Sequence, residues 1–190
     1  MADVNAILAR WRVRLGYPLA PLYLWLALPT VKSLALGMAI ALAGLLLRAV
    51  AAGHLHKQEE LTVSGPYAWT RNPLYFGSFL LVVGFAVASH SWVAAALIVG
   101  YYAIFYPAVM RREEDELRRK HGEAFDDYAA RVPLFFPRAP RRTGDSRAGA
   151  APGQLFSWDQ YARNREYQAA LGFMVGVMLL VARMLVAASG

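Results

Sequence analysis

The stretch Ser91–Met110, SWVAAALIVGYYAIFYPAVM, runs for 20 residues without a charged side chain, and Arg111-Arg112-Glu113-Glu114 follows it directly. A helix rises about 1.5 Å per residue and the hydrocarbon core of a bilayer is about 30 Å thick, so about 20 residues cross it. The stretch therefore predicts a membrane-spanning helix that ends at a charged boundary.

Four other apolar stretches accompany this one, at Leu15–Thr30, Ser33–Ala52, Leu74–Ser89 and Ala169–Ala188. Ser33–Ala52 and Ala169–Ala188 are long enough to cross, whereas the other two are short. Prolines interrupt the first, for which a buried or re-entrant segment is the alternative. The chain is only 17% charged, against about 25% in soluble domains. We expect an all-α, polytopic membrane protein of about five transmembrane helices.

Positive charges are distributed unevenly around these stretches. Of the 20 Lys and Arg residues, 18 fall on one side of the predicted membrane, and Lys32 and Arg183 are the exceptions. The positive-inside rule then places the N-terminus and the loop after the second stretch in the cytoplasm, and the C-terminus outside a cell inner membrane. The net charge of +7 reflects this orientation and attraction to anionic headgroups, so we expect no nucleic-acid partner. Arg48 either extends to the headgroups or faces a polar cavity.

The segment after the fourth stretch is amphipathic. Apolar residues recur there at steps of three or four, which predicts a cytoplasmic helix over 113–131 that helps to form a pocket. Ser157, with Gln160 three residues later, has the spacing of a helix N-cap. These features divide the chain into a membrane core (1–137), a basic linker (138–156) and an interfacial-to-transmembrane helix (157–190).

The last helix contains the spacing Gly172-x-x-x-Gly176. Small residues at this spacing allow another helix to approach closely. Contact with a second copy of the chain is one interpretation, and packing against its own helices is the other.

The chemistry is concentrated in the loop between the second and third stretches. Gly65-Pro66 indicates a tight turn, and Pro73 suits the first turn of a helix. A short hairpin between the third and fourth stretches would bring Glu113 close to Asn72 and Tyr75. Acidic groups beside aromatic rings suit a cationic small molecule such as S-adenosylmethionine. The absence of cysteine excludes thiolate zinc sites and cysteine nucleophiles, and we expect no metal site.

Several motifs in order resemble the isoprenylcysteine carboxyl methyltransferase and phospholipid methyltransferase superfamily of membrane enzymes. They are Gly65-Pro66-Tyr67, Arg71-Asn72-Pro73-Leu74-Tyr75-Phe76-Gly77, Glu113-Glu114, Gly122-Glu123-Ala124-Phe125-Asp126-Asp127-Tyr128 and Arg131-Val132-Pro133. The resemblance covers about Glu59–Pro137 and implies S-adenosylmethionine as the methyl donor. It implies donor contacts from Glu59, Glu60, Leu61, Thr62, Tyr67, Asn72, Pro73, Leu74, Tyr75 and Glu113.

The acceptor side resembles the family less closely. Many members have His where this chain has Asn72, so catalysis should not depend on an imidazole there. Isoprenylcysteine enzymes place a substrate-binding Arg four residues before the first Glu of the pair, and Val109 stands at that position here. Arg111 and Arg112 are the nearby candidates for substrate binding. An amine acceptor would need a general base, for which Glu114 and Tyr75 are the candidates.

Five functions follow from these patterns. We expect an S-adenosylmethionine-dependent methyltransferase acting on a lipid-like or prenylated, amphipathic acceptor, similar to the isoprenylcysteine enzymes. A phosphatidylethanolamine N-methyltransferase is the first alternative. A small-thiol methyltransferase, a sterol-type reductase using NADPH and a membrane scaffold without catalytic activity are the others.

Overall fold

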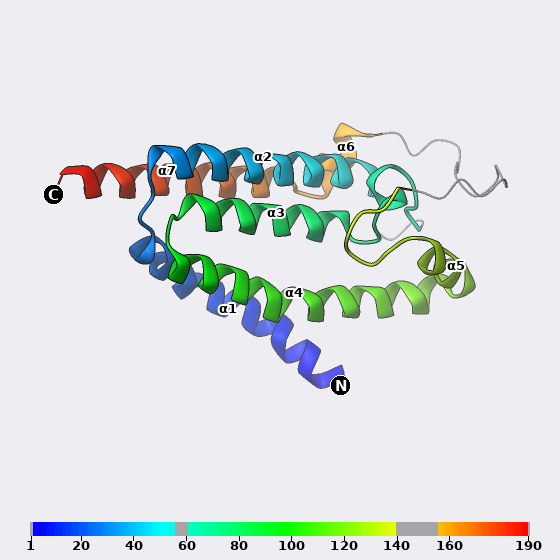
Figure 1. Cartoon of the computed structure of the whole chain (residues 1–190). Coiled ribbons are helices and arrows are strands. Elements are labelled where there is room, and N and C mark those ends of the chain that lie inside the picture. The colour runs from blue at the N-terminus through cyan, green and yellow to red at the C-terminus, as the bar shows by residue number, and fades with distance from the viewer. Residues whose placement is uncertain (1, 56–60, 140–155, 190) are drawn as a thin grey trace.

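The computed structural model describes residues 2–55, 61–139 and 156–189, and every regular element within these ranges is helical (Figure 1). The prediction of an all-α protein is confirmed for this part of the chain. The elements are α1 (Ala2–Leu26), α2 (Val31–His54), the 3-10 helix η1 (Gly65–Ala68), α3 (Pro73–Ala88), α4 (Trp92–His121), α5 (Glu123–Arg131), α6 (Trp158–Arg163) and α7 (Tyr167–Ser189).

Three of the described helices, α2, α4 and α7, are long and apolar enough to cross a membrane. The apolar helix α3 has 16 residues and is shorter. The first helix begins well before the predicted stretch 15–30 and ends at Leu26, with Pro18 and Pro21 inside it. The chain is therefore an integral membrane protein, and five spans stay a prediction.

Glycines bring α2 and α3 into close contact along their length. A Cβ atom added at Gly37 would lie 2.4 Å from the carbonyl oxygen of Gly84, and one at Gly44 would lie 2.5 Å from that of Gly77. In lipid, where the hydrophobic effect does not drive helix association, such close packing supplies much of the attraction. The antiparallel pair α2–α3 therefore forms the framework on which the other helices pack.

The separate cytoplasmic helix predicted over 113–131 is wrong in its boundaries. The helix α4 continues through the charged residues to His121, because neither Gly nor Pro occurs between Arg111 and His121. Gly122 has a φ of 52°, a left-handed conformation that glycine adopts at little cost, and the chain turns there into the short helix α5. Figure 1 shows α5 beyond the same end of the bundle as η1.

The C-terminal segment docks on the end of α2. The amide of Ser157 donates to the carbonyl of Gly53 at 2.9 Å, and the Asn164 side chain donates to the carbonyls of Ala52 at 2.8 Å and Leu55 at 3.0 Å. The N-cap prediction for Ser157 is confirmed, since its hydroxyl accepts from the Gln160 amide. The prediction of one continuous helix is wrong.

Helices α6 and α7 are separated by a turn in which Arg165 has a φ of 54°. The two glycines of the α7 motif have different neighbours. A Cβ atom at Gly176 would lie 2.7 Å from the Phe85 ring of α3, whereas one at Gly172 meets nothing within 4 Å. Gly176 thus packs within its own chain, which supports the second interpretation of the motif. The homodimer through Gly172 and Gly176 gains no support.

Candidate functional site

The loop before α3 is shaped by a glycine turn and a buried tyrosine. Gly65 begins η1. Its φ of 58° is a left-handed backbone conformation that residues other than glycine rarely adopt. The Tyr128 hydroxyl of α5 donates to the carbonyl of Tyr67 at 2.8 Å. Both tyrosines are buried, and burial raises the pKa of each phenol above its usual value. The neutral Tyr128 phenol therefore fixes the loop against α5 through its hydrogen bond to the loop backbone.

The loop also pairs with the segment that follows α5. The amide of Arg71 donates to the carbonyl of Pro133 at 2.9 Å, and the Asn72 side chain donates to the carbonyl of Leu134 at 3.0 Å. The Thr70 hydroxyl donates to the carbonyl of Phe135 at 2.9 Å. These bonds give the Val132-Pro133 motif a structural role that its sequence alone did not reveal. They also give Asn72 a structural role, since its side-chain amide donates to the backbone carbonyl of Leu134.

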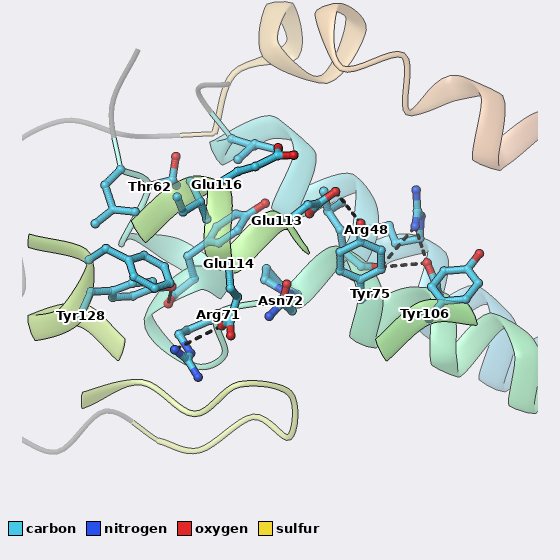
Figure 2. Close-up of a pocket in the computed structure, with 18 of the residues that line it drawn as sticks. Arg48, Thr62, Arg71, Asn72, Tyr75, Tyr106, Glu113, Glu114, Glu116 and Tyr128 are labelled. Carbon is cyan, nitrogen blue, oxygen red and sulfur yellow. Dashed lines mark hydrogen bonds and ion pairs between the residues drawn. The ribbon is translucent and has the colours of Figure 1, made fainter. Parts of the chain in front are cut away.

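Tyr75 and Glu113 meet as the hairpin topology predicted. The Tyr75 hydroxyl donates to Glu113 Oε1 at 2.6 Å, and Figure 2 shows this pair beside Arg48 and Tyr106. The Tyr102 hydroxyl of α4 donates to the Tyr75 carbonyl at 2.7 Å, which ties the first turn of α3 to α4. The acid and the phenol are thus held together at one side of the site.

Arg71 and Glu114 form an ion pair on the other side of Asn72. Their Nη1 and Oε1 atoms lie 3.2 Å apart, and both side chains are mostly buried. Burial raises the pKa of Glu114, and the Arg71 charge opposes this effect. Among the described residues, Arg71 Nε and Glu114 Oε1 are buried side-chain atoms without a hydrogen-bond partner. The pair therefore leaves one donor and one acceptor unsatisfied beside the cavity.

These residues surround a cavity of about 770 Å³. Its volume lies within the range of sites for small molecules and cofactors, about 300–1,000 Å³. Glu114 lines this cavity, and so do most of the residues predicted to contact the donor. The predicted donor contacts that line it are Leu61, Thr62, Tyr67, Asn72, Pro73, Leu74, Tyr75 and Glu113. The predicted contacts Glu59 and Glu60 lie outside the described residues.

Arg111 and Arg112 are exposed and are not part of the cavity wall. Arg112 pairs with Glu116 one turn away at 3.0 Å, an exposed i,i+4 pair. Their predicted role in substrate binding stays a prediction, with no geometric support from the cavity.

Arg48 is the main site residue for which the sequence left two interpretations open. Its side chain lines the cavity and makes a bidentate ion pair with Glu166, through Nε at 2.6 Å and Nη2 at 2.9 Å. Its Nη1 donates to the Leu74 carbonyl at 3.2 Å and to the Ser78 hydroxyl. The interpretation of a polar cavity is therefore the one that the structure supports. The 118-residue separation from Glu166 explains why no local motif revealed the pair.

A second cavity of about 330 Å³ adjoins the first. Arg48, Ser78 and Tyr106 line both cavities. Most of its remaining wall is apolar and comes from α3 and α7: Leu81, Val82, Phe85, Ala169, Gly172 and Phe173. The two cavities therefore share part of their wall, and the smaller one lies against α3 and α7.

Known proteins add three findings. The chain is 45% identical over 82 residues to the nickel-cobalt-cadmium resistance protein NccN of Alcaligenes xylosoxydans xylosoxydans. The matched residues are 43% of this chain and 38% of the relative. It is 38% identical over 90 residues to the cobalt-zinc-cadmium resistance protein CzcN of Cupriavidus metallidurans, 47% of this chain and 41% of the relative. The chain thus matches about two fifths of the length of each, and no solved structure matches it.

The phospholipid methyltransferase family matches residues 11–124, which is more than half of the chain and includes the loop, α3 and the acidic pair. Within the described residues, no group of three or more acidic or histidine side chains could hold a metal ion. The match confirms the resemblance seen in the motifs, and the chain belongs to the phospholipid methyltransferase family of membrane methyltransferases.

Proposed function

We propose that this protein transfers a methyl group from S-adenosylmethionine to an amphipathic, lipid-like acceptor. The observation that carries the proposal is a pair of adjoining cavities that share Arg48, Ser78 and Tyr106: the larger is lined by the motif residues with Glu113 and Glu114, and the smaller by residues of α3 and α7. A methyl donor in the larger cavity and an acceptor in the smaller one would meet at these shared residues.

The residues of the larger cavity fit the donor. The buried Nε of Arg71 suits a carboxylate oxygen, and the Glu113 carboxylate suits an ammonium or ribose hydroxyl. The Tyr106 ring, which packs edge-to-face with Tyr75 at 5.9 Å between centroids, offers an aromatic surface that attracts cations. Glu113 and the aromatic rings thus provide a setting for a sulfonium ion.

The reaction would need positioning more than acid–base chemistry. The acceptor's electron pair forms a bond to the methyl carbon while the carbon–sulfur bond breaks, and its electrons remain on sulfur. Aligning the two reactants and excluding water supply most of the rate of such a displacement. The chain holds the first turn of α3 for this purpose, since Arg48 and Tyr102 bind the carbonyls of Leu74 and Tyr75.

The acceptor's class decides whether a base is required. A carboxylate or thiolate acceptor carries its own electron pair, whereas an amine headgroup must first lose a proton. Tyr75 and Glu114 remain the proposed bases, with Glu113 placed to receive a proton from Tyr75 through their 2.6 Å hydrogen bond. The lining of the smaller cavity does not distinguish isoprenylcysteine-like, phospholipid and thiol acceptors. We also propose that the cavity opens to the cytoplasm.

Calorimetry with S-adenosylmethionine and the detergent-purified chain tests the donor. We expect micromolar binding that Glu113→Ala abolishes. Asp115 is exposed and lies outside the cavity wall, so Asp115→Ala should leave binding intact. Binding of NADPH instead would support a reductase, and binding of neither would support a scaffold without catalytic activity.

Membranes incubated with donor labelled in the methyl group identify the acceptor. Label released by mild base would indicate a carboxyl ester, and stable label in a lipid headgroup would indicate an N-methyltransferase. Volatile label would indicate a small thiol. An absence of label from every fraction, with the protein folded, would contradict the proposed activity.

A further inference from the structure

The C-terminal segment, which lies outside the family match at 11–124, supplies a charged partner to the site residue Arg48. Glu166 lies in the turn between α6 and α7, with only 6% of its side chain exposed. Both of its oxygens bind the Arg48 guanidinium, at 2.6 and 2.9 Å. A planar, bidentate contact of this kind fixes the orientation of the arginine as well as its charge.

Arg48 passes this constraint to the site. Its third nitrogen donates to the Leu74 carbonyl at 3.2 Å and to the Ser78 hydroxyl, so the guanidinium bridges the C-terminal segment and the first turn of α3. The Arg48 and Glu166 charges also act in opposite directions on the pKa of the buried Tyr67 phenol. The ion pair therefore reaches the proposed donor site through the hydrogen bonds that Arg48 makes to α3.

We propose that Glu166 is a positioning residue for the methyl donor, which holds Arg48 and neutralises its charge so that the cavity accepts a sulfonium cation. This inference rests on the proposed function. An arginine without its carboxylate partner would leave a positive charge in the wall of a cavity that must hold a second one. Partial burial strengthens that repulsion, since Coulomb energies grow as the effective dielectric constant falls.

The docking contacts of the C-terminal segment serve the same purpose. Asn164 and Ser157 bind the last carbonyls of α2, and the Phe156 ring packs over Gly53, where an added Cβ atom would lie 2.3 Å from it. These contacts fix the backbone on either side of α6, close to Glu166. The segment thus holds the partner of Arg48 in place from a part of the sequence that the family match does not include.

The test compares two ligands that differ in one charge. S-adenosylmethionine carries a sulfonium ion, and S-adenosylhomocysteine, its product, carries a neutral sulfur. In Glu166→Gln, which keeps the side-chain shape, we expect the dissociation constant for S-adenosylmethionine to rise about tenfold. The dissociation constant for S-adenosylhomocysteine should rise less than threefold. A loosened fold would weaken both ligands equally.

Three controls separate the possible outcomes. Asp126→Asn removes an exposed partner of Arg118 at 2.8 Å and should change neither dissociation constant. Glu166→Asp keeps the charge and should restore most of the selectivity for the cation. In an Arg48→Met background, Glu166→Gln should have no further effect on the ratio of the two constants.

Equal weakening of both ligands by Glu166→Gln, or no weakening of either, would overturn the inference while leaving the proposed function intact. If the original chain binds neither ligand, the proposed function itself fails. Thermal unfolding of each variant in detergent identifies the folded samples. If Glu166→Gln does not fold, the ratio measured for Glu166→Asp and Arg48→Met decides the matter.

Discussion

Two ion pairs at the cavity differ in where their residues lie relative to the family match. Arg71 and Glu114 both lie within residues 11–124, in motifs that identify the family. Arg48 lies in the same matched region, but its partner Glu166 lies beyond it. The motifs therefore contain both members of the Arg71–Glu114 pair, whereas the Arg48–Glu166 pair depends on a contact between distant segments. A family resemblance can thus be accurate and still leave out part of a binding site.

The α2–α3 contact offers the strongest test of the core. In Gly37→Leu, the Cβ atom would lie 2.4 Å from the carbonyl of Gly84, so the helices must separate. We expect a loss of about 3 kcal/mol in the free energy of unfolding, measured by denaturant titration in detergent. Gly100→Leu is the matched control, because a Cβ atom there meets nothing within 4 Å. Equal losses for the two variants would contradict the proposed framework.

The core ion pair should show a characteristic pH dependence. Arg71→Gln leaves the Glu114 carboxylate, whose pKa is already raised by burial, without its opposite charge. Such a carboxyl destabilises the fold once the pH exceeds its unfolded pKa, about 4.5. We expect a loss of about 2 kcal/mol at pH 7 and a smaller loss near pH 4, where the group is mostly protonated in both states. Thermal unfolding at the two pH values measures the difference, and a larger loss at the lower pH would refute the explanation.

The docking of the C-terminal segment on α2 should weaken when the Asn164 side chain is removed. Asn164→Ala removes two hydrogen bonds to the end of α2. We expect a loss of about 1–2 kcal/mol in stability and faster hydrogen exchange in α6 than in α2. Gln168→Ala, an exposed residue one turn later, should change neither quantity. Unchanged exchange in the Asn164 variant would show that the segment is held by other contacts.

The smallest effect distinguishes the two glycines of α7. Gly176→Ala requires the end of the Phe85 ring to move, so we expect a cost of about 1 kcal/mol, whereas Gly172→Ala should be neutral. Crosslinking in detergent provides the second measurement. A dimer that disappears in Gly172→Ala would restore the interpretation of this motif as an interface between copies.

The sequence predicts the elements whose signals are local. Apolar length identifies the helices, and the hairpin between the third and fourth stretches correctly places Glu113 beside Tyr75. The end of α4 could not be predicted as well, because charged residues continue a helix as readily as they begin a new one. Only the left-handed backbone of Gly122 decides that boundary.

Long-range partners left no local signal in the sequence. The pairing of Gly37 with Gly84 and of Gly44 with Gly77 requires knowing the register of two antiparallel helices. The Arg48–Glu166 pair requires knowing how the chain returns after α5. A membrane arginine can snorkel or bind a partner, and its own position in the sequence does not distinguish these outcomes.

The shortness of α3 has a consequence for the lipid around it. Its 16 residues reach about 24 Å, some 6 Å less than the hydrocarbon core of an average bilayer. For α3 to cross as the proposed fold requires, the bilayer around it would have to thin locally. Thinning lowers the headgroups toward Pro73, which lines the larger cavity, so a membrane-bound acceptor would not need to leave the leaflet to reach it. Bilayer thickness would then act as a control on turnover, with the highest rate in thin membranes.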